Sequence, residues 1–221
     1  MANVFLFVPN LIGYARIALL LLSLWLMPRS PLPAVCCYLG SALLDAFDGY
    51  AARLLNQCSR LGSVLDMLTD RCSTLCLLMQ LSVLYPSYTL GLQLSAAIDI
   101  ASHWVHMYSV NIRGSMSHKL IDRDGNRILH YYYSSRTVLF LMCAGNELFY
   151  LLLYVLYFTE GPTVVGLALG WVRLLVWFTA PVSVTKTLIN LVQMVSAAQD
   201  VAQIDQRDGH EQLDSCRDKA K

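Results

Sequence analysis

The stretch DAFDGYAARLLNQCSRLGSVLDMLTD, residues 45–70, contains the feature that decides the fold. Its aspartates form two pairs, one on each side of a short polar break, and each pair lies inside an apolar segment of helix length. A carboxylate at the centre of a membrane helix costs roughly 2.5 to 3.5 kcal/mol, so four without partners cost on the order of 10 kcal/mol. The chain must therefore neutralise these side chains, which are Asp45, Asp48, Asp66 and Asp70.

The composition is that of an integral membrane protein. Of 221 residues, 56% are hydrophobic and 14% are charged, and the mean hydropathy is +0.50. This is too apolar for an ordinary soluble domain, and the length suits one compact bundle. Seven cysteines lie mostly in apolar runs without metal-ligand spacing or a disulfide framework, so we interpret them as packing residues and not as zinc ligands.

Apolar windows of about 20 residues, the length that crosses a bilayer, occur six times. We therefore predict an all-α integral membrane bundle of six transmembrane helices. The last window is longer than one crossing needs, so we expect Pro181 to kink it or to end the crossing early. The sequence predicts a membrane domain over 1–198 and a charged cytoplasmic tail over 199–221. The six windows are approximately 10–28, 33–55, 64–85, 88–110, 137–158 and 164–195.

Lysine and arginine concentrate on one side of this predicted bundle. With six crossings, the N-terminus, the second and fourth loops and the C-terminal tail share the basic side, whereas the opposite loops offer Arg29 and Glu160. The positive-inside rule makes the basic side cytoplasmic. The second helix ends and the third begins on that side, so both aspartate pairs are predicted to face the cytoplasm.

The two aspartate pairs are predicted to converge. A connection of a few residues makes the second and third helices antiparallel neighbours, and convergent carboxylates form an oxygen-rich cage for hard cations such as Mg²⁺ or Mn²⁺. Two ions are expected, because their charge offsets the cost of inserting so many acids. Gly49 and Arg53 suit a phosphate that approaches the helix backbone, although small residues also pack helices and arginine also reaches lipid head groups.

The spacing D-x2-D-G-x2-A-R-x8-G-x3-D-x3-D is matched in full by residues 45–70. It resembles the signature of the CDP-alcohol phosphotransferase family. Further segments resemble the eukaryotic phosphatidylinositol synthase branch of that family, and the likeness extends over nearly the whole chain. These segments are VPNLIGYAR (8–16), DMLTDRCST (66–74), ASHW (101–104), SHKLID (117–122) and AGNELFY (144–150).

The resemblance implies an enzyme that transfers the phosphatidyl group from CDP-diacylglycerol to myo-inositol and releases CMP. It implies a dimetal site made by the four aspartates, in which Asp70 is also the catalytic base. It further implies that Gly49, Arg53 and Ser59 bind CDP-diacylglycerol. We interpret Arg136 as a candidate for the acceptor pocket, and the alternative is that this region anchors the chain at the interface through tyrosines.

The family resemblance also suggests a homodimer in the endoplasmic reticulum membrane, and no nucleic-acid partner is expected. One alternative is a sibling enzyme that uses the same donor with glycerol 3-phosphate or serine, because the signature describes only the donor half of the site. Another is a membrane transporter. A transporter would need polar residues along a path through both leaflets, whereas the acids here cluster on one side.

Two arginines near the cage have alternative interpretations. Arg16 lies well inside the first apolar window, and a buried arginine needs an anionic partner. It therefore either pairs with a carboxylate of the cage or faces the phosphates of a substrate. Arg71 follows Asp70 directly and either acts on that carboxylate or points to lipid head groups.

A second group of polar side chains falls on one face of the fourth predicted helix. It comprises Asp99, His103 and His106. We interpret it as a buried polar network or a wall of the cytoplasmic cavity, in preference to a metal triad.

Overall fold

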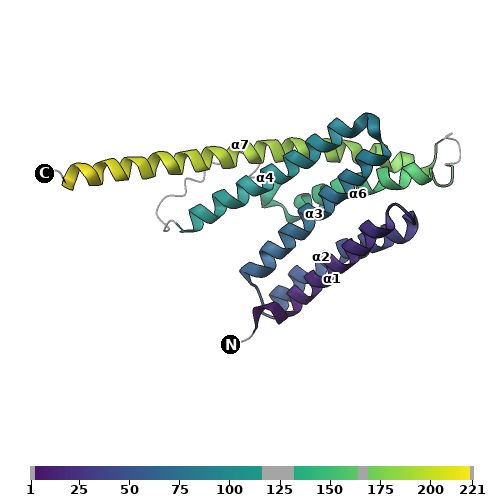
Figure 1. The fold of residues 1–221 in the computed structure, drawn as a ribbon, viewed down its shortest axis with the longest axis horizontal. Coiled ribbons are helices and arrows are strands. Elements are labelled where there is room, and N and C mark those ends of the chain that lie inside the picture. The colour runs from purple at the N-terminus through teal and green to yellow at the C-terminus, as the bar shows by residue number, and fades with distance from the viewer. Residues whose placement is uncertain (1–2, 116–131, 164–168, 220–221) are drawn as a thin grey trace. The chain divides into compact units, whose positions relative to one another are not determined.

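The computed structural model describes residues 3–115, 132–163 and 169–219. In these residues the secondary structure is helical apart from one isolated bridge between Thr163 and Gly170, so the all-α prediction is confirmed. The segment SHKLID (117–122), one of those that carry the family resemblance, lies outside the described residues. The helices, shown in Figure 1, are η1 (Val4–Leu6), α1 (Val8–Leu26), α2 (Pro31–Leu54), α3 (Arg60–Leu84), η2 (Pro86–Tyr88), α4 (Thr89–Ser115), α6 (Arg136–Phe158) and α7 (Trp171–Lys219).

The chain divides into two compact units. Unit 1 comprises Met1–Ala96 and Glu147–Ala180, and unit 2 comprises Ala97–Asn146 and Pro181–Lys221. The division falls inside α4, α6 and α7, so each of these helices contributes to both units. The complete helices α1, α2 and α3 belong to unit 1, which therefore contains both aspartate pairs.

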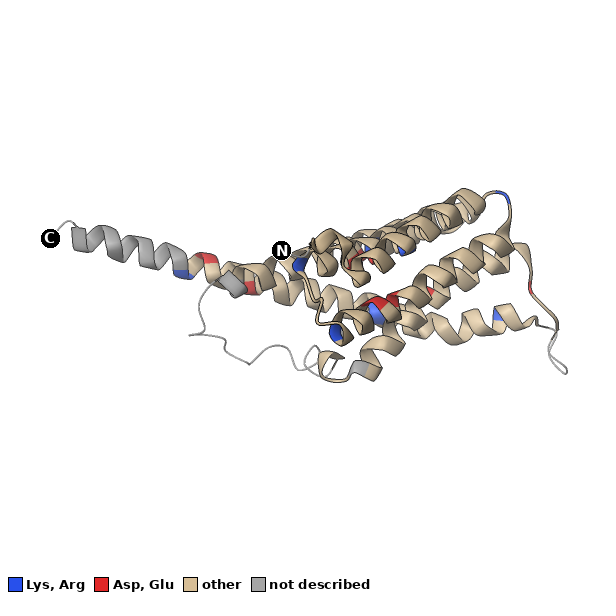
Figure 2. Cartoon of the chain, turned by 90° about the horizontal axis from the view of Figure 1, so that it is seen from below, with Lys and Arg blue, Asp and Glu red and all other residues tan. Residues whose placement is uncertain are grey.

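Helices occupy all six predicted windows, but the number of membrane crossings stays a prediction. Val8–Leu26, Thr137–Phe158 and Trp171–Arg207 are long and apolar enough to cross a membrane. The helices α2, α3 and α4 are also long, with 24, 25 and 27 residues. Their charged side chains lower their hydropathy, and for α2 and α3 these include the aspartates of the signature. Figure 2 shows how sparse charged residues are along the helices.

Whether Pro181 kinks the last helix or ends the membrane crossing early stays a prediction. Pro181 lies inside α7, which continues as a helix to Lys219, so the proline does not end it. Proline lacks the N–H that would bond to the preceding turn, and membrane helices tolerate this loss where other groups compensate. The predicted boundary between 198 and 199 falls within α7 and stays a prediction.

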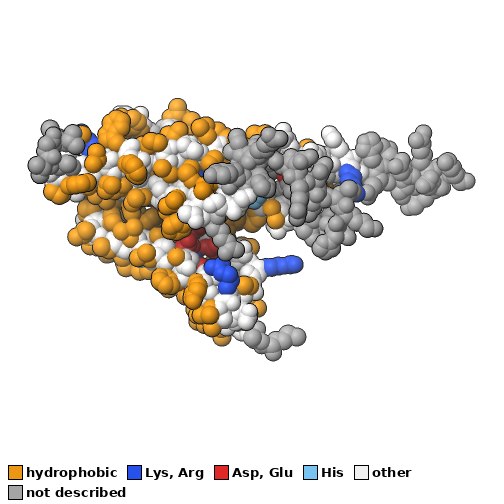
Figure 3. Space-filling model, turned by 180° about the vertical axis from the view of Figure 1, so that it is seen from behind, with side chains coloured by type: hydrophobic (Ala, Val, Ile, Leu, Met, Phe, Trp, Pro, Cys, Tyr) orange, Lys and Arg blue, Asp and Glu red, His pale blue; other side chains and the backbone are white. Residues whose placement is uncertain are grey.

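Helix α1 buries polar side chains and exposes large apolar ones. Its buried positions recur every three or four residues and therefore form one stripe along the helix. Outside this stripe, Leu21 is 62% exposed and Trp25 is 59% exposed. Figure 3 shows apolar side chains over much of the surface in view, as expected for helices surrounded by lipid. The buried stripe is Pro9, Asn10, Gly13, Arg16, Leu20 and Ser23.

Hydroxyl groups connect the helices of unit 1 by bonds to backbone carbonyls. Ser23 Oγ of α1 donates to the carbonyl of Ala34 in α2, at 2.8 Å. Ser41 Oγ of α2 donates to the carbonyl of Arg16 in α1, at 3.2 Å. These two bonds point in opposite directions between the same helices, so they fix α1 along α2 and turn the Arg16 face toward the aspartates.

The connection between α2 and α3 is set by the way α2 ends. Asn56 adopts a positive φ of 52°, which asparagine tolerates better than most residues. The N–H of Gln57 donates to the carbonyl of Ala52 at 2.9 Å, and the N–H of Asn56 donates to that of Arg53 at 3.4 Å. This is a Schellman arrangement, which closes α2 and reverses the chain within a few residues.

We expect Asn56→Val to destabilise unit 1 by about 1 to 2 kcal/mol, because a β-branched residue is strained in the left-handed region. Thermal unfolding of the purified protein in detergent would measure the change. Asn56→Gly is the matched control and should unfold close to the wild-type temperature, since glycine adopts this conformation freely. Equal unfolding temperatures for the two variants would show that the turn does not depend on this residue.

Candidate active site

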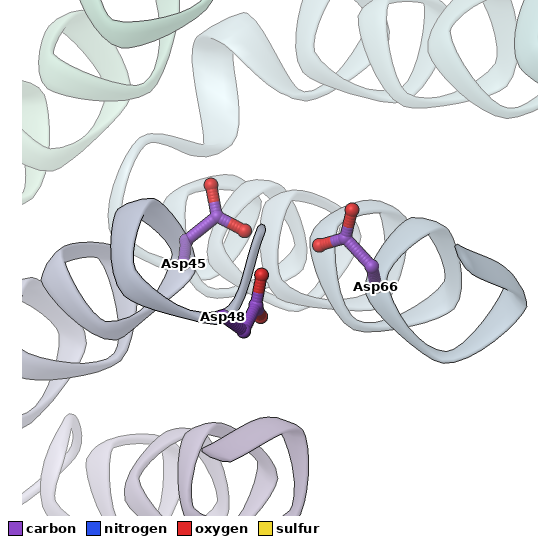
Figure 4. A group of neighbouring side chains, drawn as sticks. All are labelled: Asp45, Asp48 and Asp66. Carbon is purple, nitrogen blue, oxygen red and sulfur yellow. The ribbon is translucent and has the colours of Figure 1, made fainter. Parts of the chain in front are cut away.

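The aspartates of α2 and α3 come together as their spacing predicts. Asp45 and Asp48 lie near the end of α2, and Asp66 lies in the first half of α3. Figure 4 shows their carboxylates turned toward a shared space between the helices. One ligand oxygen from each lies within 4.8 Å of the other two, a group that could hold a metal ion.

A single guanidinium, that of Arg16, contacts all four signature carboxylates. Its Nη1 lies 2.7 Å from Oδ2 of Asp48 and 2.7 Å from Oδ1 of Asp66. Its Nη2 lies 2.6 Å from Oδ1 of Asp45 and 2.6 Å from Oδ1 of Asp70. These are the short distances of charge-assisted bonds. Of the two alternatives for Arg16, the structure shows pairing with the carboxylates.

The cage is buried at its arginine and open at two of its acids. The side chain of Arg16 is 3% exposed, whereas those of Asp45 and Asp66 are 43% and 47% exposed. Figure 3 shows acidic side chains reaching the surface beside basic ones. An ion or a phosphate arriving at this surface would therefore meet carboxylates before it met the guanidinium.

Arg71 lies beside the cage. Its Nη2 is 3.7 Å from Oδ2 of Asp70, and its side chain is 21% exposed. This favours the interpretation in which Arg71 acts on that carboxylate. Both oxygens of Asp70 consequently face a guanidinium.

The predicted donor-binding residues lie at the end of α2 and at the start of α3. Ser59 is the N-cap of α3, and its Oγ accepts a hydrogen bond from the N–H of Gly62 at 3.0 Å. Arg53 is exposed, and a Cβ placed on Gly49 would lie 3.7 Å from its Nη1. Ser59 thus has a structural role, and the binding roles of all three predicted residues stay predictions.

The acceptor-pocket candidate has less structural support. Arg136 is the first residue of α6, and its side chain lies outside the described part of the structure. Of the neighbouring tyrosines, Tyr132 is 3% exposed and Tyr133 donates to Oε1 of Gln193 at 2.8 Å. These two side chains take part in packing within unit 2, and the role of Arg136 stays a prediction.

Unit 2 contains the polar network predicted on the fourth helix. Asp99 is buried, and its Oδ1 accepts a bond from Nδ2 of Asn190 at 3.1 Å. Lys186 Nζ donates to Oδ1 of the same asparagine at 2.6 Å. His103 Nδ1 lies 3.6 Å from Oδ1 of Asp99, and His106 stacks on a tyrosine ring. Asp99 therefore lies in a buried polar network, whereas both histidines are partly exposed and the cavity-wall alternative stays a prediction.

Comparison with known proteins identifies the family of the chain. The family model described as CDP-alcohol phosphatidyltransferase matches residues 6–159, a range that contains the whole aspartate cage and Arg16. The chain belongs to the CDP-alcohol phosphatidyltransferase family. This confirms the family indicated by the signature over 45–70.

Relatives within the CDP-alcohol phosphatidyltransferase family are similar over most of their length. A Homo sapiens protein is 55% identical over 206 residues, which is 93% of this chain and 96% of the relative. A Drosophila melanogaster protein is 47% identical over a match that covers 95% of this chain and 91% of the relative. A Saccharomyces cerevisiae protein is 41% identical over 95% of this chain and 92% of the relative. All three are named CDP-diacylglycerol--inositol 3-phosphatidyltransferase.

The structure adds one acid that the sequence analysis left without a role. Glu147 of α6 accepts a bond from the Tyr38 hydroxyl of α2 at 2.8 Å and another from the Thr74 hydroxyl of α3. The Thr74 hydroxyl also lies 3.0 Å from the carbonyl oxygen of Asp70. Glu147 therefore connects three helices one turn away from the cage. A carboxylate in an apolar helix, the signal that revealed the aspartates, would have revealed it too.

The two glycines of the family signature differ in their surroundings. A Cβ on Gly62 would lie 2.8 Å from Oδ1 of Asn10 and 3.1 Å from Oγ of Ser59. Asn10 is 1% exposed and its Nδ2 donates to the carbonyl of Val4 at 2.7 Å, so it has little room to move. Among the described residues, the atom nearest to a Cβ on Gly49 would be 3.7 Å away. The fold requires a glycine at 62 but not at 49.

We expect Gly62→Ala to lower stability by about 1 to 3 kcal/mol through overpacking. Gly49→Ala should leave stability unchanged or raise it by up to about 1 kcal/mol, because alanine is the better helix former. Both effects can be measured by thermal unfolding of the purified variants in detergent. A Gly62→Ala protein as stable as the wild type would contradict the packing described for Asn10.

Proposed function

We propose that this chain transfers the phosphatidyl group of CDP-diacylglycerol to myo-inositol, forming phosphatidylinositol and CMP. The observation that carries the proposal is the convergence of the signature carboxylates into one surface-accessible cage. The activity named for relatives at 41 to 55% identity gives the donor and the acceptor. Within the family, these names favour inositol over glycerol 3-phosphate or serine.

The cage has the chemistry of a divalent metal site. Hard cations such as Mg²⁺ and Mn²⁺ take oxygen ligands, and oxygens of Asp45, Asp48 and Asp66 lie within 4.8 Å of one another. We propose that these residues, together with Asp70, would hold two such ions. Bound there, the ions would supply charge that screens the pyrophosphate and stabilises the departing CMP.

The proposed reaction is a single displacement at phosphorus. A hydroxyl oxygen of inositol bonds to the phosphorus that carries diacylglycerol, and the bond between that phosphorus and the bridging oxygen breaks. CMP leaves with the electron pair of the broken bond. The hydroxyl proton passes to a carboxylate oxygen of Asp70, which acts as the general base. This in-line displacement requires no covalent intermediate with the enzyme.

The surroundings of the cage suit a lipid-linked donor. Next to the aspartates, α2 exposes large apolar side chains that continue along the helix. Acyl chains in the bilayer could contact them while the head group reaches the cage, and Arg53 offers a forked donor to a phosphate there. The exposed side chains are Leu43 at 64%, Phe47 at 58%, Tyr50 at 59% and Leu54 at 65%.

The cellular setting is part of the proposal. We propose a multi-pass protein of the endoplasmic reticulum membrane with the cage facing the cytoplasm, which the distribution of lysine and arginine supports. A homodimer is suggested by the family resemblance stated above. Helices apolar enough to cross a membrane support the membrane location itself.

The acceptor can be tested directly with purified protein. Given CDP-diacylglycerol and Mg²⁺ or Mn²⁺, we expect CMP release with myo-inositol and little release with serine or glycerol 3-phosphate. Treatment with EDTA should abolish release, and restoring the ion should recover it, because the cage depends on divalent charge. CMP release that required serine or glycerol 3-phosphate would assign the chain to a sibling activity.

The role of Asp70 as base predicts a large loss of turnover in Asp70→Asn. The amide keeps the shape of the side chain but cannot accept the proton, so kcat should fall by about 10² to 10⁴. Thermal unfolding should show that the variant remains folded. Glu160→Gln, which removes an acid that pairs with Arg173, is the control and should retain activity. Full turnover in Asp70→Asn would remove the base assignment.

A further inference from the structure

The structure assigns Arg16 a function beyond packing: we propose that its guanidinium is a built-in counter-ion that competes with divalent ions for the aspartate cage and so sets the metal affinity. This inference rests on the metal site of the proposed function. It concerns a residue outside the D-x2-D-G-x2-A-R-x8-G-x3-D-x3-D signature, on a different helix. The contacts that carry it are those between Arg16 and the four carboxylates.

The competition follows from the oxygens that Arg16 occupies. Each of the four aspartates gives one carboxylate oxygen to the guanidinium, at 2.6 or 2.7 Å. The contacts of Asp48, Asp66 and Asp70 are hydrogen bonds, and that of Asp45 is an ion pair. A hydrogen-bonded lone pair cannot at the same time be directed at a metal ion. The guanidinium also carries a positive charge, which repels a second cation most strongly where water is scarce. A divalent ion must therefore displace Arg16 or bind more weakly beside it.

The guanidinium is held in the cage mainly through its two terminal nitrogens. Its Nε is buried and has no hydrogen-bond partner among the residues that the structure describes. The backbone of Arg16 is fixed, because its carbonyl accepts the bond from Ser41 at 3.2 Å. A side chain anchored at its backbone and at Nη1 and Nη2, but not in between, can withdraw once the carboxylates bind another cation.

This arrangement has two consequences for the cage. Without metal ions, one positive charge partly neutralises four acids in an apolar helix bundle, and this stabilises the fold. Asp70 is one of the four, so the same guanidinium covers both the proposed metal ligands and the proposed base. Release of Arg16 would make ligands and base available together, which couples metal loading to readiness for catalysis.

The experiment titrates purified full-length protein in detergent with Mn²⁺ alone, with free Mn²⁺ measured by electron paramagnetic resonance. Arg16→Met keeps the bulk of the side chain but removes its charge, and we expect Mn²⁺ to bind about tenfold more tightly or better. Arg16→Lys keeps the charge but loses the forked geometry of the guanidinium, so its affinity for Mn²⁺ should lie between those of the wild type and Arg16→Met. Arg29→Met is the matched control and should bind like the wild type, because Arg29 stacks on Trp25.

Thermal unfolding provides a second readout that does not depend on turnover. In EDTA, Arg16→Met should unfold at a lower temperature than the wild type. Adding Mn²⁺ should raise the unfolding temperature of the variant by more than it raises that of the wild type. If this variant folds only with metal, it can be purified with Mn²⁺ and challenged with a chelator. Retention of Mn²⁺ at chelator concentrations that strip the wild type would support the proposal.

Wild-type or weaker Mn²⁺ affinity in folded Arg16→Met would overturn the proposal, because Arg16 would then organise the ligands instead of competing for them. Loss of Mn²⁺ from that variant at the same or lower chelator concentration than from the wild type would overturn it as well. CMP release by the wild type with myo-inositol is measured separately. Tighter Mn²⁺ binding by Arg16→Met without such release would refute the proposed function and leave the counter-ion role standing.

Discussion

Neutralisation of four acids on apolar helices is the constraint on which the rest of unit 1 depends. Four carboxylates in apolar helices are tolerable only with positive charge among them, and the structure provides the guanidinium of Arg16 within 2.7 Å of each. One positive charge does not balance four negative ones. The remaining negative charge makes the cage receptive to divalent cations, so the requirement of the fold and the proposed chemistry have the same electrostatic origin.

The same constraint explains why the helices bury polar residues and expose apolar ones. A polar side chain facing hydrocarbon has no partner, so it turns inward and bonds to a neighbouring helix. In α1 this stripe contains Asn10, Arg16 and Ser23. In unit 2 the buried positions Ser183, Lys186 and Asn190 recur along α7 at the same spacing. Hydrogen bonds from these stripes, such as those from Ser23 to Ala34 and from Asn190 to Asp99, join neighbouring helices.

Sequence reasoning located the acids but not all of their partners. The spacing of 45–70 was enough to predict helices, their short connection and a convergent cage, because each depends on residues close in sequence. The partner of Arg16 was left open between a carboxylate and a substrate phosphate, since that choice depends on how α1 lies along α2. Glu147 received no role, because its two hydroxyl donors lie more than 70 residues away. Where the membrane crossing in α7 ends stays a prediction, because the helix itself runs on past Pro181.

The two glycines show that a family signature combines two kinds of constraint. At Gly62 the space for a Cβ is already taken by Asn10 and Ser59, so the need for glycine comes from the fold itself. At Gly49 the nearest atoms are those of Arg53, at ordinary contact distance, and a methyl group would fit. We propose that the requirement at Gly49 comes from the bound donor, whose phosphate would approach the backbone of α2 beside the carboxylates. On this proposal, Gly49 connects the signature to the donor more directly than the aspartates alone do.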